Sequence, residues 1–280
     1  MVGSSNRPSQ AWPLIRASWH LLLRDKKLLV FPALSGICCV LLVWVNYPQL
    51  FSGSTGGITR ASRPGSELMN LLSLFLLYLC LQFVIIFFNC AVVACVAMRI
   101  NGEEPTLGKG LSAAVDRLPQ IVVWSLVAAT VGAALKIIEG MFGRFRDLVG
   151  IVLEISWAAV SFLVIPILVM ERKTGFGVTR ASRQLLRETW GEGLRSTFRL
   201  YRLSLYLNIG GMILLAVGFM IPSSMVTVVF IVLTALYVPL SLTAQSALKN
   251  VLQTALYYYA RHGIVAEGFR RESLRWAFFK

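Results

Sequence analysis

The residues that could do chemistry in this sequence are few, and they lie far apart along the chain. There are two histidines, His20 and His262, one near each end. Neither has an acid or a nucleophile at motif spacing, and no G-x-S-x-G, H-E-x-x-H or Walker sequence occurs. The sequence therefore predicts no catalytic residue, no metal-ligating set and no cofactor site. The sequence does not favour an enzymatic function, but it does not exclude one, because active sites also assemble from residues that are distant in the sequence.

The five cysteines indicate neither disulfide bonds nor a metal site. Cys38, Cys39, Cys80, Cys90 and Cys95 all fall within apolar stretches. A disulfide framework is not expected there, and the spacing of Cys90 and Cys95 lacks the paired Cys/His pattern of a zinc site. We interpret these side chains as small apolar packing residues.

The elements that would position any site are long apolar helices. Residues 68–98 form a run of 31 residues without a charge. As a helix it would reach roughly 46 Å, whereas the hydrocarbon core of a bilayer is about 30 Å thick. The whole chain is 56% hydrophobic and only 14% charged. A soluble domain usually has about a quarter of its residues charged, so lipid is the expected solvent.

We predict an all-α, polytopic integral membrane helical bundle with about six transmembrane helices and interfacial amphipathic helices. A cytoplasmic segment with such an amphipathic helix, 1–27, precedes a membrane domain, 28–260, and a basic cytoplasmic tail, 261–280. Pro166 and Pro239 are expected to kink their spans. The expected spans are 28–47, 68–98, 120–138, 148–170, 203–221 and 225–248, with cytoplasmic basic segments at 99–118 and 171–202 and an exposed loop at 48–66.

Five of the polar side chains within these spans are candidates for a function, because lipid offers no hydrogen-bond partner there. Glu154 would pair with Lys136, which lies near the outer end of the third span. Gln82 and Asn89 share one face of the second span, and Asn208 lies in the fifth. One explanation is helix-to-helix hydrogen bonding and a structural ion pair. The alternative is a path for a solute, a proton or an ion.

The net charge of +14 needs an explanation of its own. No nucleic-acid recognition motif is present, so nucleic acid is not an expected partner. Basic residues at helical spacing instead indicate helices in the membrane plane that contact anionic lipid. Topology signalling by the same charges is the alternative explanation. The candidate lipid contacts are Arg180, Arg183 and Arg187 on one helical face and Arg195, Arg199 and Arg202 in a second stripe.

A weak repeat accompanies these basic segments. R-A-S-W-H-L-L-L-R precedes the first spanning hairpin, S-A-A-V-D-R-L the second and R-A-S-R-Q-L-L-R the third. Ala17-Ser18 and Ala181-Ser182 take equivalent places. The repeat implies three parallel hairpin units, unlike the inverted repeats of many transporters.

Five motifs also carry a family resemblance. They are S-W-H-L-L-L-R-D-K-K-L-L-V-F-P-A-L-S-G-I, F-F-N-C-A-V-V-A-C, W-S-L-V-A-A-T-V-G, R-x-T-W-G-E and A-L-Y-Y-Y-A-R-H-G. Together they resemble an uncharacterised family of bacterial multi-pass membrane proteins, known only as a domain of unknown function. The likeness covers about Leu14 to Lys280. It implies a six-helix protein of the cytoplasmic membrane and supplies no activity.

These observations favour a non-enzymatic envelope protein that organises lipids or partner proteins. Its expected partners are membrane lipids, anionic ones included, and other membrane proteins or a second copy of the chain. A small-solute or ion transporter or channel is the alternative, and a lipid-directed membrane enzyme is a second. A continuous polar cavity at mid-membrane would favour transport, and a dry interior packed with Leu and Phe would favour the first hypothesis.

The distribution of Lys and Arg predicts the orientation. Of the 27, 22 lie in residues 1–27, 99–118, 171–202 and 249–280. Positive charge is retained in the cytoplasm. This rule places both termini on the cytoplasmic side of a bacterial inner membrane. A topology reporter inserted in the 48–66 loop is therefore expected outside, and one in 171–202 inside. A cytoplasmic signal from the 48–66 loop would contradict this orientation.

Overall fold

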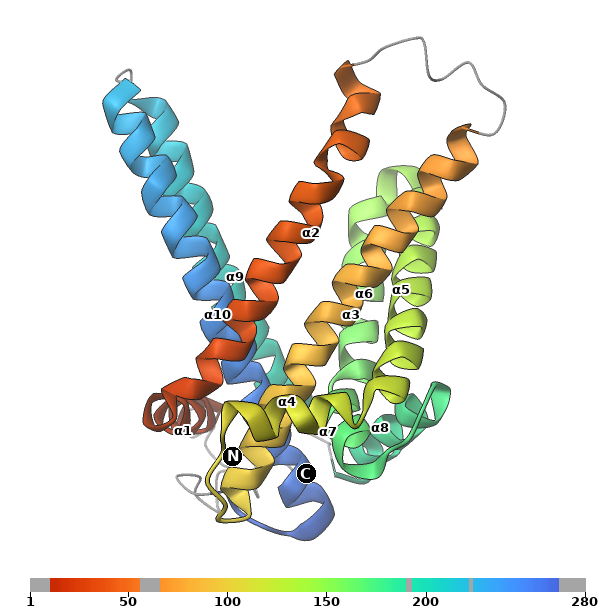
Figure 1. The fold of residues 1–280 in the computed structure, drawn as a ribbon, viewed down its shortest axis with the longest axis vertical. Helices are drawn as coiled ribbons and strands as arrows, with labels where there is room; N and C mark the ends of the chain where they lie inside the picture. The colour runs from red at the N-terminus through yellow and green to blue at the C-terminus, as the bar shows by residue number, and fades with distance from the viewer. Residues whose placement is uncertain (1–10, 56–65, 190–192, 222–223, 267–280) are drawn as a thin grey trace, which may run out of the picture. The chain divides into compact units, whose positions relative to one another are not determined.

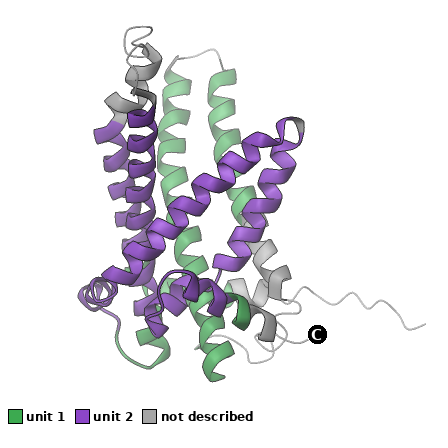
Figure 2. Cartoon of the chain, turned by 90° about the vertical axis from the view of Figure 1, so that its right-hand side faces the viewer, with its two compact units in different colours: residues 1–29, 96–104, 183–280 green, residues 30–95, 105–182 purple. Residues whose placement is uncertain are grey.

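The computed structural model of this chain is all-α over the residues that it describes, which are 11–55, 66–189, 193–221 and 224–266 (Figure 1). Side chains within 11–15, 47–55, 66–67, 144, 186–189, 193–203 and 224 are not described. These residues form helices and turns, with no strand among them. The helices divide into two compact units, residues 1–29, 96–104 and 183–280 and residues 30–95 and 105–182 (Figure 2).

The first unit is built on a pair of long helices, α9 (Gly193–Met220) and α10 (Ser224–His262), which lie side by side (Figure 1). Side-chain hydroxyls join the two helices. Tyr237 donates to the carbonyl oxygen of Leu207 at 2.9 Å, and Thr227 donates to that of Gly218 at 2.9 Å. The short helix α1 (Ala11–Arg24) and the 3-10 helix η1 (Lys26–Leu29) pack against α10.

The second unit contains α2 (Val30–Thr55), most of α3 (Ser66–Ile100), α4 (Leu107–Val115) and a hairpin of α5 (Leu118–Met141) with α6 (Arg146–Ser161). The 3-10 helix η2 (Gly143–Phe145) turns this hairpin, and Trp124 stacks on Trp157 across it with ring centroids 5.9 Å apart. Beyond α6 lie α7 (Val164–Glu171) and α8 (Phe176–Thr189), which continues into the first unit's residues.

The span expected at 148–170 is interrupted between α6 and α7. The break falls at Phe162 and Leu163. Pro166 is the cause, because it has no N–H to donate to the carbonyl of Phe162, four residues earlier, and its ring crowds that carbonyl. Pro239, by contrast, lies inside α10 without ending it.

The helices run past the spans that hydropathy marks. Helix α2 extends to Thr55 through part of the expected 48–66 loop, α5 extends to Met141, and α10 extends to His262, past the expected end of its span at 248. A change from apolar to polar residues marks the edge of the apolar layer, whereas the backbone hydrogen-bond ladder continues until a turn signal ends it. The helix expected within 99–118 is present as α4.

Five segments are long and apolar enough to cross a membrane by length and composition. The span expected at 203–221 corresponds to a shorter apolar stretch of α9, Ser204–Met220. The chain is therefore an all-α polytopic membrane protein. The five segments are Lys26–Asn46, Leu68–Ile100, Leu118–Met141, Arg146–Glu171 and Met225–His262.

The packing of α4 gives a stability prediction. A methyl group at Gly110 would lie 2.5 Å from Cys95 Sγ and 2.9 Å from Phe31 Cζ, so Gly110→Ala should cost about 1–3 kcal/mol by overpacking. Gly108 of the same helix has open space around it, and Gly108→Ala should stabilise by up to about 1 kcal/mol. Thermal unfolding in detergent should place the two midpoints on opposite sides of wild type. An unchanged Gly110→Ala midpoint would contradict the close approach.

Candidate functional site

Helix α8 presents a basic face and buries the opposite one. Val178, Ser182 and Leu185 are buried, at a spacing of four and then three residues, which places them on one side of a helix. Arg180 and Arg183 are exposed. The amphipathic helix predicted in 171–202 is therefore present. The helical spacing of both arginines places them on the face opposite the buried residues.

A hydrogen bond anchors this buried face. Ser182 Oγ donates to the carbonyl oxygen of Val160 at 2.8 Å. Val160 belongs to the last four residues of α6, whose carbonyls have no N–H partner within a helix that ends at Ser161. The break before Pro166 thus creates the acceptor that Ser182 uses.

The same pattern of exposure recurs in α1. In Arg16-Ala-Ser-Trp-His-Leu21 and in Arg180-Ala-Ser-Arg-Gln-Leu185, the arginine is exposed, the alanine half-buried, the serine fully buried, the next two residues exposed and the leucine buried. In α4, Ser112, Ala113 and Ala114 repeat the first three steps, with Ala114 fully buried. The three short helices therefore share one way of burying a small residue, at matching places in the repeated segments.

The remaining candidate arginines are divided between two helices. Arg187 lies in α8, whereas Arg195, Arg199 and Arg202 lie in the first turns of α9. The side chains of these four arginines lie outside the described residues. The two predicted stripes are therefore segments of different helices.

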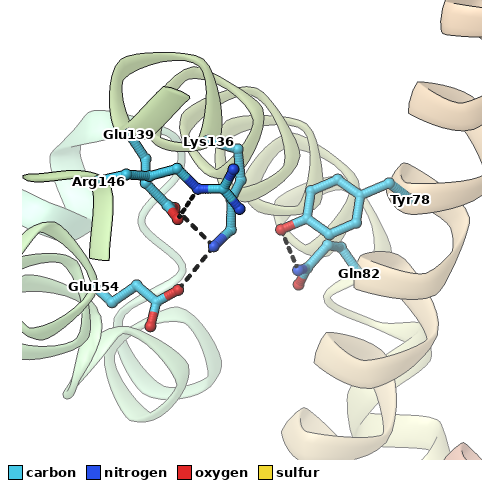
Figure 3. Close-up of polar contacts among 6 residues, drawn as sticks. All are labelled: Tyr78, Gln82, Lys136, Glu139, Arg146 and Glu154. Atoms are coloured by element: carbon cyan, nitrogen blue, oxygen red, sulfur yellow. Dashed lines mark hydrogen bonds and ion pairs between the residues drawn. The ribbon is translucent and has the colours of Figure 1, made fainter. Parts of the chain in front are cut away.

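A network of four charges joins α5 to α6 (Figure 3). The predicted pair is confirmed, because Lys136 Nζ lies 3.1 Å from Glu154 Oε1. Lys136 also lies 2.9 Å from Glu139 Oε2, and Arg146 Nε lies 3.6 Å from Glu139 Oε1. Two cations and two anions thus balance within the hairpin.

Glu139 is the centre of this network, although the sequence did not single it out. Its side chain is 14% exposed, whereas Lys136 is 66% and Glu154 63% exposed. The carboxyl group lies over Gly150 of α6, where an added methyl group would come within 2.9 Å of Glu139 Cδ. Glu139 therefore closes the hairpin, and this geometry suits a structural ion pair. Proton or ion coupling through Glu154 remains a hypothesis.

The uncharged candidates are divided between helices α3 and α9, at places that belong to different units. Gln82 Nε2 donates to Tyr78 Oη at 3.0 Å within α3, which differs from the expected bond between helices (Figure 3). The cause is spacing, since residues four apart meet on one helix face. Asn89 is half-buried in α3, and Asn208 is exposed on α9.

Several polar contacts join segments that the sequence does not relate. In the second unit, Arg117 Nε donates to the carbonyl oxygen of Val169 at 3.0 Å, near the end of α7. Burial and, next, the nearby charge of Arg172 lower the pKa of Arg117. In the first unit, Arg99 Nε lies 3.4 Å from Asp25 Oδ2. No pattern within the sequence predicts which carbonyl or carboxylate such side chains reach.

Helix α10 also buries polar side chains that we did not select from the sequence. Asn250, Gln253 and Thr254 are buried, and Lys249 beside them is exposed. Lys249 and Gln253 are one helical turn apart, a spacing that could have drawn attention to them. The five cysteines are free thiols. The described residues contain no group of three or more His, Cys, Asp or Glu side chains placed to hold a metal ion.

Comparison with known protein families shows which family this chain belongs to. Residues 68–268 match a family described as "Family of unknown function (DUF6159)". No curated protein and no solved structure matches the chain.

The network in the α5–α6 hairpin predicts an order of stabilities. Glu139→Gln should lower the thermal unfolding midpoint in detergent more than Glu154→Gln, because Glu139 contacts two cations and is the less exposed carboxylate. Glu104→Gln, at an exposed position outside the hairpin, is the control and should leave the midpoint near wild type. A larger loss for Glu154→Gln would contradict the central place of Glu139.

Proposed function

Since this chain belongs to DUF6159, a family of unknown function, we propose its function from the geometry of its own helices. It is a non-enzymatic, multi-pass protein of the bacterial inner membrane, with both termini in the cytoplasm. Its short basic helices lie in the plane of the cytoplasmic leaflet and bind anionic lipid headgroups, and they organise those lipids and partner proteins around the bundle.

The shared exposure pattern of α1 and α8 is the observation that supports this proposal. Each helix buries a serine and a leucine against the protein and exposes arginine on the other side. Apolar side chains are exposed beside these charges, Trp19 at 42%, Leu23 at 48% and Phe176 at 70%. A helix with apolar and basic residues together on its free surface is typical of an interfacial helix, with tryptophan at headgroup level.

Electrostatics favours the same arrangement. Each Lys or Arg close to an anionic leaflet contributes about 1 kcal/mol, and this attraction falls off within a Debye length. Arginine also forms paired hydrogen bonds with a phosphate group. The anchoring of α8 through Ser182 holds Arg180 and Arg183 on a fixed face, so less side-chain and backbone freedom is lost when lipid binds.

A specific observation favours transport as the second candidate function. The buried polar residues Asn250, Gln253 and Thr254 lie in a helix that is otherwise long and apolar enough to cross a membrane. Polar groups at such positions often line the path of a solute or an ion. Solute uptake into vesicles that contain the purified protein would favour this candidate.

Lipid binding by α8 can be tested with a charge-matched pair of variants. Arg180→Gln with Arg183→Gln removes two cations from the exposed face of α8. This change should weaken binding of phosphatidylglycerol to the full-length protein by about 2 kcal/mol, or roughly thirty-fold. Native mass spectrometry of the protein in mild detergent, titrated with the lipid, measures this affinity.

The control is Arg172→Gln with Lys173→Gln, which removes two cations from the same 171–202 segment but from the turn that precedes α8. Both double variants reduce the topology signal equally. A much smaller effect of the control supports a lipid-binding face on α8. Equal effects would mean that only total charge matters, and the proposal would fail.

A further inference from the structure

A lysine interrupts the most completely buried stretch of α10. Residues 247–258 make more than three turns of helix, and every one of them is buried except Lys249. Its neighbours Leu248 and Asn250 are 7% and 2% exposed. The residues around Lys249 are therefore buried, while the lysine side chain is exposed over part of its surface.

One turn further along α10, a buried amide lacks a partner. Gln253 is 2% exposed, and its Oε1 has no hydrogen-bond donor among the described residues. The adjacent Thr254 differs, because its hydroxyl donates to the carbonyl oxygen of Asn250 at 2.7 Å. Buried polar atoms without a partner are rare in folded proteins, and each one calls for an explanation such as a bound group.

Lys249 and Gln253 lie on the same side of the helix, with about 5–6 Å between their Cβ atoms. Lysine supplies a compact positive charge that suits a phosphate group. The Gln253 oxygen accepts a hydrogen bond and therefore needs an N–H or O–H donor close to that phosphate. The pair thus requires one ligand that offers an anionic phosphate and a donor together.

The depth of Lys249 along α10 agrees with such a ligand. The apolar segment begins at Met225, and 24 residues of helix separate it from Lys249. At 1.5 Å per residue this distance is about 36 Å, which exceeds the hydrocarbon core of about 30 Å and stays within the full bilayer of about 40–45 Å. With Met225 at one edge of the core, Lys249 lies at the level of the phosphate groups on the other side.

We propose that Lys249 and Gln253 form a binding site for a phosphate group that carries a hydrogen-bond donor. Lys249 pairs with the phosphate oxygens, and Gln253 Oε1 accepts from the donor. A phosphatidylethanolamine or phosphatidylglycerol headgroup has this chemistry, and so does free hydrogen phosphate. This site differs in chemistry from the basic faces of α1 and α8, which attract any anionic headgroup and do not select for a donor.

Two lipids of equal charge test the proposal. Phosphatidylethanolamine and phosphatidylcholine are both zwitterionic, but the choline group has no N–H to donate. For the full-length protein in detergent, we expect phosphatidylethanolamine to bind about tenfold more tightly than phosphatidylcholine, as measured by native mass spectrometry. Gln253→Met should abolish this preference, and Lys249→Gln should weaken binding of both lipids. Equal binding of the two lipids to wild type would overturn the site.

Control variants separate this site from the basic helices. Lys173→Gln removes a cation elsewhere and should leave the preference intact, as should Arg180→Gln with Arg183→Gln even if those changes weaken phosphatidylglycerol binding. If only inorganic phosphate binds, and does so in a Lys249-dependent way, the ligand is the free ion. If Lys249→Gln does not fold, Gln253→Met alone decides, and a preference that survives it refutes the proposal.

Discussion

Backbone groups that have no water to bond with constrain every part of this fold. In apolar surroundings, a single segment can satisfy its own N–H and C=O groups only by forming a helix. The described residues are accordingly helical. Where a helix ends, side chains of other segments supply the missing donors. Ser182 donates to the carbonyl of Val160 at the end of α6, just before the break at Pro166, and Arg117 donates to that of Val169 near the end of α7. The ends of α6 and α7 therefore provide the acceptors to which α8 and the residue before α5 attach.

The attachment of the short helices follows from residue size as well as from hydrogen bonding. Apolar side chains gain little by leaving lipid for protein, so close packing and polar contacts must hold helices together. Ser18, Ala114 and Ser182 are all fully buried at equivalent places in three short helices. A small residue at this place lets each helix lie close to the surface beneath it. The exposed side of each helix is then free to differ in charge.

Features of this molecule that depend on local sequence patterns were predictable, whereas features that depend on long-range contacts were not. The short helices were predictable because charge and hydropathy vary with a helical period. The ion pair of Glu154 with Lys136 was predictable because charged side chains within apolar spans pair with opposite charges. The role of Glu139 was not, since it depends on Gly150 of the next helix lying beneath it. The burial of Gln253 was not predictable for a similar reason, because it depends on neighbouring segments that hydropathy does not identify.

The two charged regions differ in how their charge is balanced. In the α5–α6 hairpin, Lys136 and Arg146 meet Glu139 and Glu154 within the protein. Helix α8 contains three arginines and one acid, Glu188. Headgroup phosphates are the abundant anions of a membrane, and they attract a charge excess of that kind. The hairpin network accordingly suits a structural role, and the excess on α8 supports our proposal that this helix binds lipid.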